Sequence, residues 1–162
     1  MKILILGHGR HGKDTVAEMI AKRTGLRHTS SSLFAAEKVV FKTMAHRYAT
    51  PEKCYEDRHN HRQEWYELIK DYNTPDKSRL CRELLQDYDI YVGMRDNDEY
   101  EACMGAMLFD YVLWVDRHMF CADDPTMKIL FDPVEMVYIN NNGGLERLSN
   151  NVARFLTCSG ML

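Results

Sequence analysis

Short apolar runs alternate with stretches of helical periodicity along the whole chain. The runs are rich in aliphatic, β-branched and aromatic residues, which is typical of strands that are buried on both faces of a sheet. We predict five strands from them, at residues 3–6, 26–31, 89–93, 111–115 and 136–139.

The stretches between these runs place apolar residues three and four positions apart, as amphipathic helices do. Residues 14–24 and 145–156 each carry such a stripe, and residues 97–108 predict a further helix in which Met104 and Met107 take core positions. Three successive helices, with no strand among them, are predicted after the second strand: residues 34–48, 61–72 and 76–86.

Alternation of strands and helices predicts a parallel sheet with helices on both faces. The expected fold class is therefore α/β, a three-layer sandwich with about five parallel strands. The length of 162 residues suits one domain, so we expect a single domain over residues 1–162. The three successive helices, at about residues 33–86, are expected to form a small cap over the carboxyl ends of the strands, where α/β folds bind ligands.

Composition narrows the function classes. The chain is 45% hydrophobic and 28% charged, and its formal net charge of −3 excludes the general cationic field that binds nucleic acids or membranes non-specifically. No apolar run approaches the ~18–20 residues of a membrane span. The cysteines are odd in number and never form C-x-x-C, which argues against a disulfide framework or a zinc ribbon and suits a reducing cytoplasm: Cys54, Cys81, Cys103, Cys121 and Cys158.

The most informative residues follow the first predicted strand and open the first predicted helix. In such a loop, glycines let backbone N–H groups point at phosphate oxygens, the helix N-terminus adds partial positive charge, and a lysine reaches the terminal phosphates. The alternative is a chance glycine-rich turn, which the position between a strand and a helix disfavours. We predict that the whole loop binds ATP: Gly7, His8, Gly9, Arg10, His11, Gly12, Lys13, Asp14 and Thr15.

Individual loop residues carry further expectations. The residue after the lysine is Asp14 and the hydroxyl residue, Thr15, comes one position later, so Mg²⁺ is expected on Asp14, directly or through water, or on Thr15. Arg10 is expected near the phosphates or the edge of the nucleotide base. His8 and His11 are expected to be exposed to solvent.

The sequence Gly12-Lys13-Asp14-Thr15, followed by a helix, resembles the G-K-D-T variant of phage deoxynucleoside monophosphate kinases and related small P-loop kinases of the thymidylate-kinase-like group. Residues 90–95, followed by Glu99, resemble the family's strand that ends in x-D-x-R-x-x-x-E, and residues 138–148 are similar to its last strand, Asn-x-Gly turn and closing helix. The resemblance implies a P-loop NTPase fold, ATP as phosphoryl donor, Mg²⁺ and a deoxynucleotide acceptor.

One position departs from the family pattern. Gly93 stands two residues before Arg95, where the family has an acidic residue. A Walker-B-like carboxylate is therefore missing there, and only Asp89 or Asp96 is left to substitute as the second ligand of the metal.

Phosphoryl transfer depends on positioning the migrating group and neutralising its charge, which suits Lys and Arg side chains. We predict Lys13, Asp14, Arg95 and Arg117 as catalytic residues, because Arg95 matches the family's arginine and Arg117 follows the fourth predicted strand. Arg62, in the cap, is predicted to bind the acceptor together with Arg95. Each arginine equally fits a solvated surface charge.

Further acceptor-binding residues are predicted where the second strand meets the cap: Ser31, Ser32 and Phe34. The serines also suit the N-cap of a helix, and Phe34 suits either a base-stacking or a packing position. The cap carries a basic cluster that is either a solvated face or a dock for an anionic acceptor: Arg47, Lys53, Arg58, His59, His61 and Arg62.

Two acceptors remain open. A free monophosphate supplies its own oxygen as the nucleophile, whereas an alcohol needs a carboxylate to remove its proton, for which Asp14 or Asp96 would serve. The resemblance includes small phage kinases that phosphorylate the hydroxymethyl group of 5-hydroxymethyluracil in phage DNA during thymidine hypermodification. The little room for a lid between Arg117 and Phe131 suits such a polymer.

Hypotheses from other classes are a non-catalytic nucleotide-binding module, motivated by Gly93, and a GTPase switch, which the lack of an Asn-Lys-x-Asp motif disfavours. The expected partners are ATP and a deoxynucleotide, free or within DNA, with no membrane; a homodimer is left open. The expected location is the cytoplasm, that of the host cell if the chain is encoded by a phage.

Overall fold

The computed structural model describes residues 1–121 and 123–162. Five parallel strands form one sheet in the order β2-β3-β1-β4-β5. Every predicted strand is present, and the ends differ from the prediction by at most two residues. In chain order the strands are β1 (Ile3–Leu6), β2 (His28–Ser30), β3 (Ile90–Val92), β4 (Tyr111–Asp116) and β5 (Val137–Asn140).

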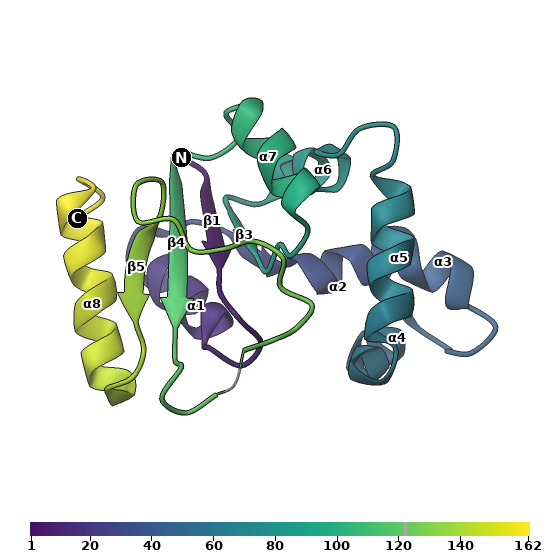
Figure 1. Cartoon of the computed structure of the whole chain (residues 1–162), viewed down its shortest axis with the longest axis horizontal. Coiled ribbons are helices and arrows are strands. Elements are labelled where there is room, and N and C mark those ends of the chain that lie inside the picture. Colours follow the sequence, from purple (N-terminus) through teal and green to yellow (C-terminus); the bar gives the residue numbers. More distant parts are fainter. Residues whose placement is uncertain (122) are drawn as a thin grey trace.

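The first strand lies at the centre of the sheet, between β3 and β4 (Figure 1). Ile3 pairs in register with Ile90 on one side and with Tyr111 on the other. The carboxyl end of β1 is therefore the switch point of the sheet, where open α/β folds bind their ligands. The glycine-rich loop begins at this point.

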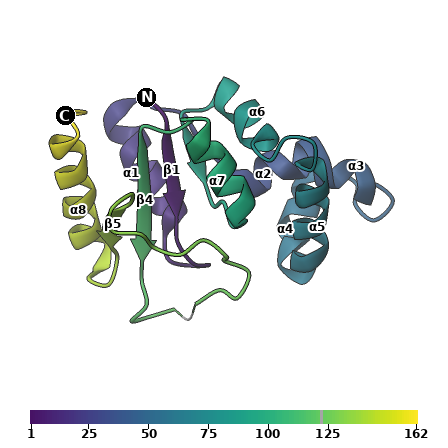
Figure 2. The same ribbon diagram turned by 45° about the horizontal axis from the view of Figure 1, so that its top comes forward.

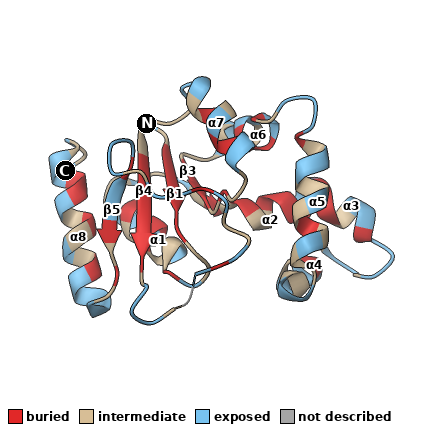
Figure 3. Cartoon of the chain, viewed as in Figure 1, coloured by how far each residue is buried: buried red, intermediate tan, exposed pale blue. Residues whose placement is uncertain are grey.

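Side chains of β1 alternate between two hydrophobic cores, one on each face of the sheet. Ile3 and Ile5 share a core with α1 (Lys13–Thr24) and α8 (Gly144–Cys158). Leu4 and Leu6 share the other core with α6 (Arg79–Asp87), α7 (Asn97–Gly105) and the helices that precede them. Figure 3 shows β1 buried along its whole length and β4 buried along nearly all of it, as a sheet covered on both faces requires. The predicted three-layer α/β sandwich is confirmed.

The chain between β2 and β3 is helical. Figures 1 and 2 show that α3, α4 and α5 stand to one side of the sheet, on the side opposite α8. This part of the chain consists of α2 (Ser31–Ala35), a π-helical turn (Ala36–Val40), α3 (Phe41–Met44), α4 (Pro51–Glu56), a 3₁₀ turn (Asp57–Asn60), α5 (Arg62–Tyr72) and then α6.

The predicted helix over residues 34–48 is divided by the π-helical turn and ends at Met44. The short helix α4 was not predicted. It begins where the Thr50 hydroxyl accepts from the backbone N–H of Lys53 (3.3 Å) and Pro51 takes the first helical position. Both are ordinary signals for a helix start.

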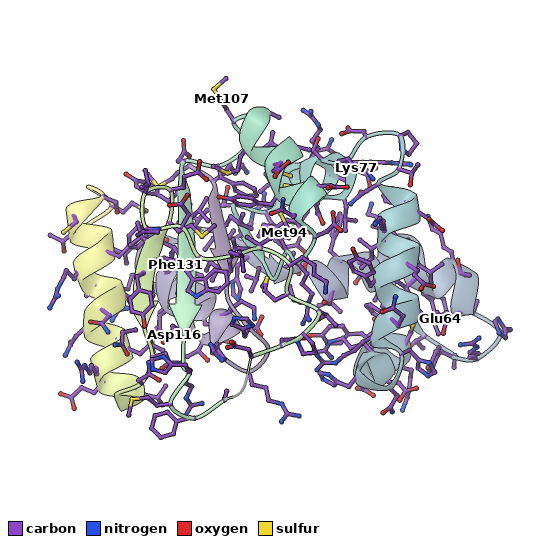
Figure 4. All side chains as sticks on the ribbon, in the orientation of Figure 1. Glu64, Lys77, Met94, Met107, Asp116 and Phe131 are labelled. Atoms are coloured by element: carbon purple, nitrogen blue, oxygen red, sulfur yellow. The ribbon has the colours of Figure 1, made fainter. Side chains whose placement is uncertain are left out.

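The end of α7 at Gly105 corrects the placement of Met107 in the core. Met107 lies beyond the helix with a φ of 52°, and its side chain is 87% exposed. Met94, by contrast, is buried, and Figure 4 shows it inside the molecule while Met107 points away from it. No helix in the part of the chain that the structure describes is both long and apolar enough to cross a bilayer.

Candidate active site

The loop between β1 and α1 approaches its neighbours so closely that glycine is required at two positions. Gly7 has a φ of 137°, and a Cβ there would lie 2.3 Å from the carbonyl oxygen of Val115 on β4. Gly12, the N-cap of α1, has a φ of 93°, and a Cβ there would lie 2.4 Å from Nδ2 of Asn141. The loop therefore packs directly on the ends of β4 and β5 and leads into a helix N-terminus, as a phosphate-binding loop does.

Gly7→Ala is expected to abolish ATP binding and to lower the free energy of unfolding by about 1–3 kcal/mol, because the new Cβ forces the loop away from β4. Gly25→Ala is the matched control, since Gly25 also has a positive φ, 77°, but nothing lies within 4 Å of its Cβ position. Calorimetric titration with ATP and thermal unfolding check both variants. Normal ATP affinity in Gly7→Ala would contradict this description of the loop.

Two histidines anchor the loop, which corrects the expectation that both are exposed. His11 is fully buried, and its Nδ1 accepts from the backbone N–H of Arg117 (3.0 Å). Burial, reinforced by His8, lowers the pKa of His11 and favours the neutral ring that accepts this bond. Nδ1 of the half-buried His8 accepts from the backbone N–H of Asp124 (3.0 Å). Both imidazoles thus connect the loop to the segment that follows β4.

Lys13, the first residue of α1, folds back over the loop. Its Nζ donates to the carbonyl oxygen of His8 (2.7 Å). Burial, together with the nearby charge of Arg95, lowers the pKa of Lys13 to about 8. An ammonium group with so little hydration gains from an anion placed beside it, so this position suits the terminal phosphates of a nucleotide.

A cavity of about 200 Å³ lies between this loop, the ends of β2 and β3, α5 and the start of α7. Several of its walls are basic, which indicates an anionic ligand. The lining includes Gly9, Arg10, Lys13 and Asp14 from the loop, Ser31, Ser32 and Arg95 from the sheet ends, and Arg58, His59, Arg62 and Lys70 from the helical region between β2 and β3.

Asp124, in the segment between β4 and β5, joins two of these arginines. Its Oδ2 accepts from Nη1 of Arg95 (2.7 Å) and of Arg62 (3.0 Å), and its Oδ1 accepts from the hydroxyl of Thr126 (2.6 Å). The carboxylate also lies against the loop, since Oδ2 is 2.8 Å from the Cβ position of Gly9. Arg62 and Arg95, which come from distant elements, therefore converge on the Asp124 carboxylate beside the phosphate-binding loop.

The charge of this anion is stabilised by its surroundings. The Asp124 side chain is only 4% exposed. Although this burial opposes ionisation, hydrogen bonds from Thr126 and the charge of Arg95 hold the pKa of the carboxyl well below its usual range. Carboxylates and phosphates accept from guanidinium groups in the same geometry, so the arrangement around Asp124 suits a phosphate equally well.

Glu99, in the first turn of α7, is a buried carboxyl in the wall of the cavity. Its Oε1 accepts from the hydroxyl of Tyr91 on β3 (3.0 Å). Burial raises the pKa of Glu99 to about 7; the Tyr91 hydrogen bond opposes this rise, and the charge of Asp96 adds to it.

Because its pKa is raised on folding, Glu99 makes stability depend on pH. The folded state holds the proton that the unfolded state loses near pH 4.5, so stability falls as the pH rises through about 7. Glu99→Gln is expected to match the wild type at pH 4–5 and to exceed it by about 3 kcal/mol above pH 8. Denaturant unfolding across this range, with the exposed Glu101→Gln as control, measures the difference; parallel curves for wild type and Glu99→Gln would refute it.

Four predicted acceptor-binding residues line this one cavity: Ser31, Ser32, Arg62 and Arg95. Phe34 lies elsewhere, in the hydrophobic core, with its ring edge-on to Tyr88 at 6.5 Å between centroids. The N-cap of α2 is Ser30, which makes no side-chain capping hydrogen bond. The Ser30 hydroxyl is therefore not engaged in capping α2.

Arg117 is not among the described residues that line the cavity. Its guanidinium group lies over the ring of Phe120, 5.2 Å from the centroid. The neighbouring Asp116, at the carboxyl end of β4 (Figure 4), accepts from the hydroxyl of Tyr138 (2.7 Å) and from Nδ2 of Asn142 (3.0 Å). This end of β4 thus connects to the turn after β5, whereas Arg95 lines the cavity.

The predicted Mg²⁺ ligands differ in position. Asp14 lines the cavity, whereas Thr15 is not among the described lining residues. The Cβ position of Gly93 lies 3.4 Å from Oγ of Ser31 and 3.9 Å from Cε of Lys13. An acidic side chain at this position, as in the family pattern, would lie beside the lysine, and glycine provides none. Within residues 1–121 and 123–162, no cluster of three or more His, Cys, Asp or Glu could hold a metal ion. Mg²⁺ commonly binds to one or two carboxylates plus substrate phosphates and water, a role that Asp14 fits.

The sheet order and the loop define a P-loop α/β protein. No protein-family model and no curated protein matches the sequence. Solved structures with a similar fold include a sugar kinase from Janibacter sp. (15% identity, TM-score 0.50, covering 99% of this chain and 94% of that one). Another is a gluconokinase from Sinorhizobium meliloti (13% identity, TM-score 0.51, covering 98% and 95%). Within the P-loop class, the chain has the fold of these small kinases.

Proposed function

We propose that this protein is a P-loop kinase that transfers the γ-phosphoryl group of ATP to a deoxynucleoside monophosphate. The observation that carries the proposal is the convergence of Arg62 and Arg95 on the Asp124 carboxylate beside the phosphate-binding loop. The site thus offers one place for an anion on the loop and a second on the two arginines. The fold shared with a sugar kinase and a gluconokinase supports phosphoryl transfer, and the G-K-D-T resemblance supports a deoxynucleotide.

The residues divide the chemistry between them. Loop N–H groups and the N-terminus of α1 hold the triphosphate, and Lys13 neutralises the negative charge of the γ-phosphoryl group during its transfer. Arg95 and Arg62 hold the acceptor phosphate, whose own oxygen attacks phosphorus as the bond to ADP breaks. Mg²⁺, held by the triphosphate and Asp14, would neutralise charge on the β- and γ-oxygens. An acceptor of this kind needs no general base.

An acceptor phosphate must replace Asp124 on the two arginines. Asp124→Asn is therefore expected to lower the acceptor KM by roughly tenfold, because a neutral amide competes less well for guanidinium groups. Asp87→Asn removes the same charge from an exposed residue at the end of α6, outside the cavity lining, and is expected to leave KM unchanged. Initial rates against acceptor concentration decide it: an unchanged or raised KM in Asp124→Asn would place the acceptor phosphate elsewhere.

The proposal is tested by transfer of labelled γ-phosphate from ATP, with Mg²⁺, to a panel of free deoxynucleoside monophosphates. Label in a free diphosphate is the expected result. ATP binding without transfer to any acceptor would instead indicate a non-catalytic nucleotide-binding module, as the missing carboxylate at Gly93 suggests. A preference for GTP over ATP would point to the GTPase class.

A second candidate acceptor is the hydroxymethyl group of 5-hydroxymethyluracil in DNA. It is favoured by the basic cap residues in the cavity wall, Arg58, His59 and Lys70, which suit a phosphodiester backbone. Duplex DNA that contains thymine or 5-hydroxymethyluracil belongs in the same panel. Label only in the hydroxymethylated duplex would replace the monophosphate proposal with a DNA kinase.

A further inference from the structure

The Asp124 carboxylate lies at the junction of the two subsites proposed above. Its Oδ2 forms ion pairs with Nη1 of Arg95 (2.7 Å) and Nη1 of Arg62 (3.0 Å), the groups assigned to the acceptor phosphate. The same oxygen lies 2.8 Å from the Cβ position of Gly9, in the loop assigned to the triphosphate. One anion of the chain itself therefore contacts both the ATP subsite and the acceptor subsite.

The charge of Asp124 also reaches the lysine that is assigned to the γ-phosphate. Burial and then the charge of Arg95 lower the pKa of Lys13, and the charge of Asp124 acts in the opposite direction. The Asp124 side chain is only 4% exposed, so water and salt screen its charge little. A γ-phosphate on Lys13 would bring further negative charge beside this carboxylate, and like charges at short range repel each other.

The Asp124–Thr126 turn is attached to the loop as well as to the arginines. The backbone N–H of Asp124 donates to Nδ1 of His8 in the loop (3.0 Å). Oδ1 of Asp124 accepts from the hydroxyl (2.6 Å) and the backbone N–H (3.0 Å) of Thr126, and the Thr126 hydroxyl accepts from Arg95. A change at the loop can therefore reach the arginines through this turn.

We propose that ATP releases Asp124 from Arg62 and Arg95, so that ATP and the acceptor monophosphate bind cooperatively; this inference rests on the kinase function proposed above. Before either ligand binds, the carboxylate is paired with both arginines. Each ligand alone must displace it, the triphosphate by repulsion and the acceptor phosphate by competition. The second ligand finds Asp124 already displaced and binds more tightly, which is positive cooperativity.

This mechanism relates the affinities of the two ligands to each other. The factor by which bound ATP tightens the monophosphate must equal the factor by which the monophosphate tightens ATP. Asp124→Asn weakens the contact that each ligand must displace, so it should tighten each ligand alone by about the same factor and remove the coupling. The lower acceptor KM expected above for Asp124→Asn then applies at ATP concentrations below saturation.

Calorimetric titrations test this inference with the non-hydrolysable β,γ-imido analogue of ATP, in the presence of Mg²⁺, and with dAMP, dCMP, dGMP and dTMP. Each ligand is titrated alone and with the other at saturation. In the wild type, the analogue is expected to lower the dissociation constant of the most tightly bound monophosphate roughly tenfold, and the converse titration should give the same factor. Independent binding of the two ligands to the wild type would overturn the inference without any variant.

Two variants separate the role of the carboxylate from effects on folding, which thermal unfolding monitors. Asp124→Asn is expected to bind the analogue alone and the monophosphate alone roughly tenfold more tightly, with no remaining coupling. Asp87→Asn removes the same charge from an exposed residue at the end of α6 and should keep the wild-type coupling. Coupling that survives in Asp124→Asn would overturn the inference. Weaker binding of the analogue to Asp124→Asn would overturn it too, because the carboxylate would then assist the triphosphate or its Mg²⁺.

Transfer assays with ATP, run in parallel, distinguish this inference from the kinase function. Coupled binding that depends on Asp124, with no transfer to any monophosphate, would reject the kinase and leave the coupling standing. Transfer with independent binding of the two ligands would reject only the coupling. Failure to bind any monophosphate would reject both.

Discussion

Lys13→Ala is expected to reduce transfer to every acceptor by at least roughly 10³-fold, the scale on which charge at a transferring phosphoryl group acts. The lost ammonium group lies over the loop, bonded to the His8 carbonyl, where burial and Arg95 already lower its pKa to about 8. A bound triphosphate would restore the full charge. Single-turnover transfer of labelled phosphate, together with ATP titration, separates lost chemistry from lost binding.

Lys22→Ala is the matched control for this variant. Lys22 is exposed in the last turn of the same helix, so its removal changes the net charge equally without touching the loop. Thermal unfolding shows whether Lys13→Ala is still folded. Near-normal turnover in a folded Lys13→Ala protein would remove the phosphate-binding loop from the reaction.

Arg95→Ala is expected to slow transfer by roughly 10²- to 10⁵-fold, because a preorganised positive charge at the acceptor is lost. Among the described residues, Asp124 then keeps only Arg62 as an ion-pair partner, so a lower melting temperature is expected as well. Arg95→Lys keeps the positive charge but loses the forked pair of guanidinium donors, so its transfer rate should lie between those of the wild type and Arg95→Ala. Initial rates at saturating ATP provide the measurement.

Arg82→Ala controls for the loss of an arginine from the surface. Arg82 lies on α6, half-exposed, in an ion pair with Asp76 (3.4 Å), away from the cavity lining. The Arg82→Ala variant should transfer phosphate at the wild-type rate. A loss of less than tenfold in Arg95→Ala would assign Arg95 to the solvated surface instead.

Much of the fold follows from local sequence patterns. The aliphatic run at β1 and the glycines after it are readable because strand burial and loop geometry each restrict the residue type. The helical region after β2 is less readable, since a π-helical turn divides residues 31–44 and the short α4 depends on only Thr50 and Pro51. The early end of α7, which exposes Met107, likewise depends on a local φ of 52° that periodicity does not reveal.

The site was only partly readable because its contacts join distant segments. The loop residues are consecutive, whereas Asp124 meets Arg62 and Arg95 from 62 and 29 positions away. The only local signal for Asp124 is the Asp-x-Thr turn with Thr126, which says nothing about arginines. The burial of His11 and the raised pKa of Glu99 also come from neighbours brought by the fold.

The central claim is that one site holds the γ-phosphate of ATP on the loop and an acceptor phosphate on Arg62 and Arg95. Calorimetry with a bisubstrate compound, adenosine joined by five phosphates to a deoxynucleoside, tests it most directly. We predict that this compound binds at least roughly 10²-fold more tightly than ATP or the monophosphate alone, as linked ligands do when both subsites are engaged, and that Lys13→Ala and Arg95→Ala each remove the gain. Affinity equal to that of ATP alone would contradict the claim.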